Sequence, residues 1–323
     1  MYKENEINQN ISQYNYAEAP SDFKAGVLNK AYEKASRYHA SEENRVVGYN
    51  LLKYSDRFNP SFIRSYNEKV TNFHQTNQGN PDEAKKISLV QEAMDHEAIG
   101  NYNWFGDSYR ILKMAALDDM NNSTDMVVVN RELNNEGIIK AKTALAIDVT
   151  YSEDRYEDKL EHIVYLLQKY PELLKNDVFF DPETDTVGTK LIPQVVLYDS
   201  KSNLDIRMAN WINDAHGPEA IENDKTQLNY LSQAFIQSVI LSKVSKAPTP
   251  ANVHHKKHYI KNSVLLKEVL IKKVNELKII PDVEECIDAL GSATRTRTQT
   301  IKEIVCPVQN FKQNTLHKIV WGF

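Results

Sequence analysis

The segment from Thr124 to Thr150 constrains the fold of this chain more than any other. Two apolar runs, Met126–Val129 and Thr143–Ile147, flank a polar stretch that contains asparagines and one glycine. Valine, isoleucine and threonine favour strands, and clusters of asparagine and glycine favour the turn between two strands. The segment is therefore predicted to form an antiparallel strand pair.

Two aspartates lie at the same end of this predicted pair. If the turn is centred between Glu136 and Gly137, Asp125 falls opposite Asp148. Opposed like charges destabilise a strand pair, so a fold that keeps both carboxylates there protonates one or holds a cation between them. A divalent metal on paired carboxylates can activate water. Alternatively, the register is shifted by one residue. Asp125 then only marks the start of the strand, and Asp148 faces solvent or caps the next helix.

The remaining elements follow from apolar periodicity and from helix-start signals. Asn80 is predicted to cap a helix whose first position is Pro81. Helices are predicted for Phe23–Ala35, Glu42–Tyr54, Pro60–Phe73, the segment after Pro81 to about residue 100, Ser108–Met120, Tyr151–Tyr170, Asn203–Ile212, Gln227–Ser245, Lys261–Leu277 and Pro281–Leu290. Short strands are predicted for Asp177–Phe180 and, after a turn containing Pro182 and Gly188, for Leu191–Tyr198.

This order of elements predicts an α+β protein, with a small mixed β-sheet flanked by helices and largely helical N- and C-terminal regions. The predicted divisions are a flexible N-terminus (1–20), a helical region (21–100), an α/β core (101–216) and a helical, basic C-terminal region (217–323). The start MYKENEINQN lacks the apolar core of a signal peptide, and no apolar stretch is long enough to cross a membrane. We therefore expect a cytoplasmic protein, or one exported without a signal peptide.

Charge is distributed unevenly along the chain. The net charge is −5, yet residues 225–323 contain 15 Lys/Arg against 7 Asp/Glu. This asymmetry indicates an anionic partner for the last third, with nucleic acid as the first candidate, or an internal match between an acidic front and a basic back. The predicted phosphate contacts are Arg295 and Arg297, which alternate with threonine, and the pair Lys256 and Lys257.

The two aspartates, set in this order of elements, resemble the core of the PD-(D/E)xK nucleases over roughly residues 107–200. A helix, a hairpin with Asp125 at the start of one strand and Asp148 on the next, a helix and a strand carry the resemblance. It implies that the two acids bind Mg²⁺ and that a lysine two residues after the second acid helps to activate water.

The chain departs from this pattern at the lysine position, which Thr150 occupies. Threonine cannot supply a cation, so Lys159 on the following helix is the first predicted substitute and Lys142 the second. An upstream acid often completes such a site, and Asp107 or Glu97 could serve.

Three further patterns leave other hypotheses open. Asp185 together with Asp199-Ser200-Lys201 matches the D…DxK motif letter for letter. The segment from Asp199 to Lys201, however, looks like a loop and helix cap. The cluster His254, His255 and His258 could bind zinc with additional ligands, touch phosphate from a basic loop, or lie on a solvated helix start. Cys306 with His317 could form a cysteine hydrolase pair, whereas Cys286 lies where a thiolate is disfavoured.

The leading hypothesis is a metal-dependent nuclease, or a nuclease-derived nucleic-acid-binding protein, with Mg²⁺ as its cofactor. The alternative from another class is a non-catalytic protein-interaction module, such as a bacterial effector, whose sheet is only a scaffold. A catalytic site requires Asp125, Asp148 and an ammonium group around one position, whereas a scaffold scatters them.

Overall fold

The structure of the protein is a computed structural model that describes residues 19–40, 56–76, 81–112, 118, 122–133, 139–181, 183–213, 225–244 and 249–276. The helices predicted for Glu42–Tyr54 and Pro281–Leu290 lie outside the described residues. No helix in these ranges is long and apolar enough to cross a membrane.

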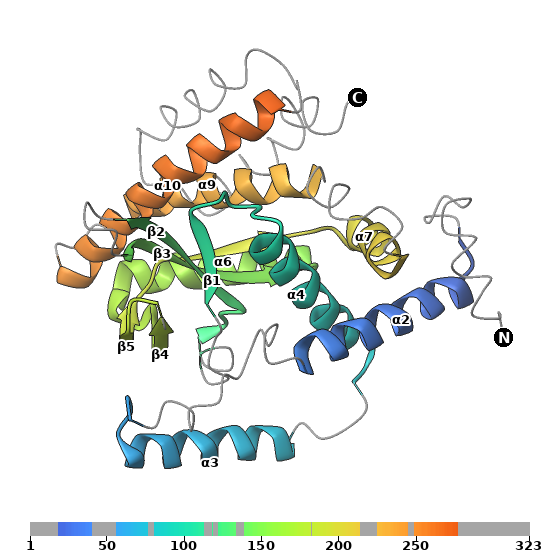
Figure 1. The fold of residues 1–323 in the computed structure, drawn as a ribbon, viewed down its shortest axis with the longest axis horizontal. Coiled ribbons are helices and arrows are strands. Elements are labelled where there is room, and N and C mark those ends of the chain that lie inside the picture. Colours follow the sequence, from blue (N-terminus) through green and yellow to red (C-terminus); the bar gives the residue numbers. More distant parts are fainter. Residues whose placement is uncertain are drawn as a thin grey trace.

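A mixed four-stranded sheet forms the centre of the fold (Figure 1). Its strands, in spatial order, are β1 (Tyr109–Leu112), β2 (Met126–Leu133), β3 (Ile139–Thr150) and β6 (Gln194–Tyr198). The first three are antiparallel, and β6 runs parallel to β3. A second sheet pairs β4 (Lys175–Asp181) with β5 (Thr186–Leu191). The predicted α+β class with a small mixed sheet is confirmed.

Seven α-helices surround the sheets within the described part of the chain. They are α2 (Ser21–Ala40), α3 (Pro60–Thr76), α4 (Glu83–Asn101), α6 (Glu153–Lys169), α7 (Lys201–Asn213), α9 (Lys225–Val244) and α10 (Pro250–Glu276). A short 3-10 helix, η3 (Pro171–Leu173), follows α6. Figure 1 shows α9 and α10 side by side along the sheet, and α3 at the margin of the molecule.

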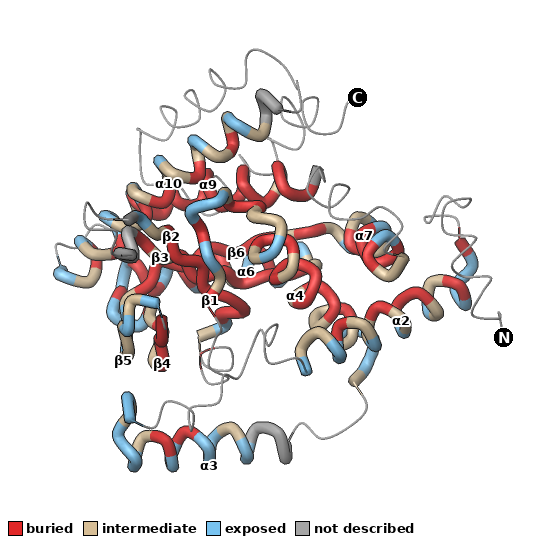
Figure 2. The backbone as a smooth tube through the Cα atoms, viewed as in Figure 1, coloured by how far each residue is buried: buried red, intermediate tan, exposed pale blue. Residues whose placement is uncertain are grey.

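The main sheet is covered on both faces, as the buried strands in Figure 2 show. Leu145 and Ile147 of β3 belong to a core that includes side chains of α4, α6, α9 and α10. The alternate residue Ala146 packs in a separate cluster with Phe179 and Ile192, which come from the β4–β5 region. Because β3 is buried on both faces, a charged side chain on it is costly unless it has a partner.

The other helices form smaller cores around this sheet. α2, α4 and α7 pack together through side chains such as Val27, Met94 and Leu204. α3 packs on the β4–β5 sheet through Tyr66, which is clustered with Val178 and other apolar residues.

The predicted β2–β3 register is confirmed. Met126 pairs with Ile147, and the N–H of Asp125 donates to the Ile147 oxygen over 2.9 Å, which places Asp125 beside Asp148. The register shifted by one residue is therefore excluded at the aspartates, although it occurs nearer the turn, where Leu133 pairs with Ile139. A β-bulge between Asn130 and the next residue of β2 separates this part of the ladder from the part at the aspartates.

One helix prediction and one strand prediction are wrong. Ser108–Met120 was predicted as a helix, but Tyr109–Leu112 forms the edge strand β1, because its backbone pairs with β2 and four residues are too few to show alternation. The single strand predicted for Leu191–Tyr198 is divided into the end of β5 and β6, because Pro193 has no N–H to contribute to a ladder. Gly188 lies within β5 rather than in the turn.

Two helix starts also differ from the prediction. The N-cap of α4 is Asp82 rather than Asn80, since the Asp82 carboxylate accepts the Lys85 N–H over 2.8 Å. α10 begins at Pro250, before the predicted Lys261, and therefore includes the histidine cluster.

Candidate active site

A cleft of about 500 Å³ lies beside the end of the sheet where β2 begins and β3 ends. Its walls come from the segment before β2, from α6, from the chain after α6 and from the start of β6. It is lined by Asn122, Ser123, Asp148, Asp158, Lys159, His162, Ile163, Leu166, Leu173, Leu174, Lys175, Asp177 and Gln194.

Asp148 and Lys159 form an ion pair in this cleft. Asp148 Oδ1 accepts a hydrogen bond from Lys159 Nζ, and the two side chains are 2% and 29% exposed. Helix α6 carries the lysine to this position, and Ser152 caps that helix by accepting the Arg155 N–H over 3.3 Å. Lys159, the first predicted substitute for the lysine of the nuclease pattern, therefore lies at the second acid. Thr150, at the family's lysine position, instead accepts the Ser152 N–H over 3.3 Å.

Asp125 lies next to this pair but does not line the cleft. Its Oδ2 accepts the N–H of Val149 over 2.6 Å, and the residue is 8% exposed. The strand register thus brings together two acids that are far apart in sequence. The structure therefore brings Asp125, Asp148 and Lys159 into one region of the fold.

Gln194 fixes one wall of the cleft and was missed by the sequence analysis. Its side-chain amide donates to the main-chain oxygens of Asn122 and Ser123 over 3.2 and 2.8 Å. One signal could have revealed it, because Gln194 is the single polar side chain between Leu191 and Leu197. A polar residue within a buried strand requires a partner.

Asp118 fixes the same wall from the other side and was also missed. Its carboxylate accepts the N–H groups of Asp177 and Val178 over 2.6 and 3.1 Å, and the amide of Asn122 over 2.9 Å. Burial raises the pKa of Asp118 to about 6, against the lowering effect of these hydrogen bonds. The segment before β2 is therefore tied to both β4 and β6.

Lys142 is not part of this arrangement. It lies six residues before Asp148 on β3, which corresponds to about 20 Å along a strand. Lys142 is also the residue skipped at the β-bulge, because Thr143 pairs with Asn130 and Ala141 with Arg131. The bulge interrupts the regular alternation of strand faces on which the prediction of Lys142 relied.

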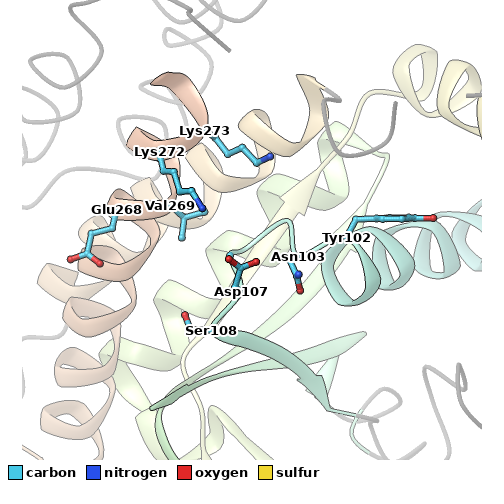
Figure 3. Close-up of a pocket in the computed structure, with 9 residues that line it drawn as sticks. Tyr102, Asn103, Asp107, Ser108, Glu268, Val269, Lys272 and Lys273 are labelled. Atoms are coloured by element: carbon cyan, nitrogen blue, oxygen red, sulfur yellow. The ribbon is translucent and has the colours of Figure 1, made fainter. Parts of the chain in front are cut away.

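Neither predicted upstream acid reaches the pair through a contact in the structure. Glu97 accepts a hydrogen bond from Trp211 Nε1 over 2.5 Å, at the packing of α4 against α7. Asp107 lines a second pocket of about 250 Å³ between the loop before β1 and α10 (Figure 3). In Figure 3, Asp107 and Ser108 lie across from Lys272 and Lys273. Because β1 pairs with the later part of β2, this pocket is remote from Asp125.

The literal D…DxK pair does not assemble. Asp185 lies in the turn of the second sheet, where it accepts a hydrogen bond from Arg57 over 2.6 Å. Asp199 follows β6 and accepts from Arg207 over 2.9 Å, while Lys201 pairs with Asp205 on α7. The loop and helix-cap interpretation of Ser200 is correct, because Ser200 Oγ accepts the Asn203 N–H over 3.3 Å.

Arg207 organises a buried polar network near the end of β6. Its guanidinium donates to Asp199 over 2.9 Å and to Asp95 over 2.7 Å, and Tyr230 donates to the other Asp95 oxygen over 3.0 Å. The guanidinium also lies over the Trp104 ring at 5.4 Å. Burial raises the pKa of Asp95 to about 6, although Arg207 opposes the shift. The network joins α4, α7 and α9 and is separate from the cleft residues.

The three histidines anchor α10 to the strands β3 and β5 and to η3. His254 contacts the Leu191 oxygen at 2.9 Å, His255 contacts the Pro171 oxygen at 2.9 Å, and His258 contacts Thr143 Oγ1 at 3.0 Å. Burial lowers the pKa of both His255 and His258 to about 4, which keeps these rings neutral. The predicted solvated helix start is therefore wrong for this cluster.

Other predicted positions have different outcomes. Within the described ranges, no group of three or more His, Cys, Asp or Glu is arranged to hold a metal ion, so the zinc site is not formed there. Lys256 and Lys257 are exposed on α10, and their role as phosphate contacts stays a prediction. The predictions on Arg295, Arg297, Cys286, Cys306 and His317 lie outside the described residues.

Comparisons of the chain with protein-family models, with curated proteins and with solved structures find no match.

Proposed function

We propose that the protein is a metal-dependent nuclease whose reaction takes place in the cleft at Asp148. The observation that carries this proposal is the ion pair between Lys159 and the buried Asp148 carboxylate, with Asp125 on the adjacent strand position. Burying a carboxylate in a sheet is costly, and an apolar pair of similar size often stabilises a fold equally well. A buried ion pair that opens into a cleft is therefore a candidate for function rather than for stability alone.

The order of elements supports the same proposal. Along the chain, β1, β2 and β3 are followed by α6, then by η3, β4 and β5, and finally by β6. The hairpin of β2 and β3, the helix α6 after it and a later strand paired with β3 are the part of the order on which the resemblance to PD-(D/E)xK nucleases rests. The helix predicted before the hairpin, over Ser108–Met120, begins instead as the strand β1. The parallel pairing of β6 with β3 places Gln194 in the cleft with Asp148.

Asp125 and Asp148 are the residues that would hold Mg²⁺. This ion is usually bound through one or two carboxylates, with waters and substrate phosphate as the other ligands, so two acids are sufficient. When bound, a divalent ion activates water and stabilises charge on the reacting phosphate. Lys159 would orient the attacking water and stabilise negative charge as it develops on the phosphodiester.

The test is Mg²⁺ and Mn²⁺ binding by calorimetry, followed by cleavage assays on DNA and RNA. Asp148→Asn keeps the side-chain size and removes the charge, so binding and cleavage are expected to be lost. The matched control is Glu161→Gln, an exposed acid on α6 that does not line the cleft. Circular dichroism establishes that each variant is folded.

Two outcomes would count against the proposal. Equal metal binding in the wild type and in Asp148→Asn would place the ion elsewhere. A folded wild type that neither binds metal nor cleaves nucleic acid in its presence would favour the non-catalytic interaction module, with Asp125 and Lys159 serving only to stabilise the sheet.

A further inference from the structure

The outer edge of β6 is closed by side chains rather than by another strand. Within the described part of the chain, β6 ends the spatial order of the main sheet, where it pairs with β3. The Pro193 oxygen and the Asp199 N–H bond to β3. Since main-chain groups alternate between the two sides of a strand, those of Gln194, Val196 and Tyr198 face away from β3. In an edge strand such groups are open to pairing with another chain.

Two glutamines of α9 bond to these outward-facing groups. Gln237 Oε1 accepts the Val196 N–H over 2.8 Å, and Gln237 Nε2 donates to the Val196 oxygen over 2.6 Å. Gln233 bonds to Tyr198 in the same way, with distances of 2.7 and 2.8 Å. Because a glutamine amide contains both a carbonyl acceptor and N–H donors, each of these side chains takes the place of one peptide group of a neighbouring strand.

Tyr259 of α10 completes the row at the start of β6. Its hydroxyl accepts the Gln194 N–H over 3.0 Å and donates to the Gln194 oxygen over 2.7 Å. The N–H and the oxygen of each outward-facing residue of β6 are therefore bonded to a side chain. Gln233, Gln237 and Tyr259 are at most 2% exposed. Buried polar side chains need hydrogen-bond partners, and here the strand edge supplies them.

The spacing of the two glutamines matches the spacing of the strand. Gln233 and Gln237 are four residues apart on α9, which corresponds to about 6 Å along a helix. Val196 and Tyr198 are two residues apart on β6, which corresponds to about 6.6 Å along a strand. One face of α9 can therefore present two amides in register with alternate residues of β6.

The sequence of β6 would favour self-association if its edge were open. The strand QVVLY contains no charged residue, no proline and no glycine, and its two valines and its tyrosine favour strands. Uncharged segments with high strand propensity pair with identical segments of other chains. The partner that best fits an open β6 edge is therefore β6 of a second copy of this chain.

We propose that Gln233, Gln237 and Tyr259 act as a substitute strand that blocks the β6 edge against pairing with β6 of a second copy of this chain. The block is built into the fold, because side chains of α9 and α10 belong to the same core as those of β6. It gives α9 and α10 a role in keeping the sheet from associating edge to edge. This role does not depend on the proposed nuclease function.

Hydrogen exchange at the backbone of β6 tests the bonds of the block. The double variant Gln233→Leu/Gln237→Leu keeps side chains of similar size and removes both amides. Amide exchange measured by NMR should then accelerate by roughly 10- to 100-fold at Val196 and Tyr198 relative to Leu197, whose N–H faces β3. If the double variant does not fold, the single variants replace it in both measurements, and Gln237→Leu should act at Val196 and Gln233→Leu at Tyr198.

Self-association tests what the block prevents. The matched control is Leu231→Ala, which destabilises α9 at a fully buried position and leaves the glutamines in place. In sedimentation velocity at equal protein concentration, the glutamine variants should form larger species than the wild type and Leu231→Ala form.

The outcomes separate a block from an ordinary contribution to stability. Exchange that accelerates at the outward-facing amides, together with association of the glutamine variants alone, supports the block. Uniform acceleration along β6, no association of the glutamine variants, or equal association of Leu231→Ala overturns it. Neither measurement involves metal or nucleic acid, so failure of the block and failure of the proposed function are distinguishable.

Discussion

Replacing Lys159 with methionine tests how much the ion pair in the cleft contributes to the free energy of unfolding. The substitution keeps most of the side-chain length and leaves the Asp148 carboxylate, which is 2% exposed, without the ammonium group. Breaking a fully buried pair from one side costs about 3–5 kcal/mol. Because Lys159 is 29% exposed and water can take its place, we expect a loss of about 2 kcal/mol at pH 7. In a chain of 323 residues that loss lowers Tm by about 3 °C.

The assay is urea unfolding followed by circular dichroism, on Lys159→Met, Asp148→Asn and the double variant. Asp148→Asn is expected to cost about 1 kcal/mol, because Lys159 can turn toward solvent. The double variant should therefore be more stable than the two losses together indicate, with a coupling energy of about 1–2 kcal/mol. Lys169→Met, at an exposed position on the same helix, should change stability by less than about 0.5 kcal/mol.

Mg²⁺ adds a second readout to the same variants. In Lys159→Met the two acids lack a nearby ammonium group, so added Mg²⁺ should stabilise the folded protein. The free energy of unfolding should rise by about 1.4 kcal/mol for each tenfold excess of Mg²⁺ over Kd. A loss below about 0.5 kcal/mol in Lys159→Met, together with additive effects in the double variant, would refute the coupling on which the proposed site depends.

Three other perturbations have defined outcomes. Arg207→Met removes the guanidinium from two buried carboxylates and should cost about 3–5 kcal/mol in urea unfolding. The pKa of His255 is about 4 in the folded protein and about 6.5 when unfolded, so the unfolded chain binds the proton first. The contribution of His255 to stability should therefore fall by about 3 kcal/mol as the pH drops from about 6.5 to 4, and the difference in stability between the wild type and His255→Gln, measured by unfolding across that range, should change by this amount. Gly106→Ala places a Cβ 2.8 Å from Val269 at φ +96° and should lower Tm in calorimetry by more than Gly188→Ala, which has a similar φ of +107° but open space around it.

The β2–β3 pair could be predicted because its signal is local. Two apolar runs and a short polar turn determine the two strands, and the β-bulge then sets the register that places Asp125 beside Asp148. Helix α6 was equally clear, since acids begin it and apolar residues recur along one face. Lys159 could be predicted as the substitute lysine because it lies on the helix that starts shortly after Asp148.

The remaining features depend on contacts between distant segments. β1 has four residues, and only its pairing with β2 makes it a strand. The bulge that displaces Lys142 is set by the pairing of β2 with β3 and leaves no mark in either strand alone. The role of Asp118 depends on the backbone of β4, which approaches it only in the folded molecule. The periodicity of apolar residues along the sequence does not show which distant segments will come into contact.

The parallel pairing of β3 with β6 has a consequence for the synthesis of the protein. Ala146 pairs with Gln194, so the two strands that bring Asp148 and Gln194 together are separated by the whole of α6, β4 and β5. The hairpin of β2 and β3 can form as soon as Thr150 has left the ribosome, but the complete cleft cannot. Pairing between segments this far apart follows local structure in folding. A nascent chain can therefore bring its two acids together in the hairpin, but it lacks the wall of the cleft that contains Gln194 until synthesis has passed Tyr198.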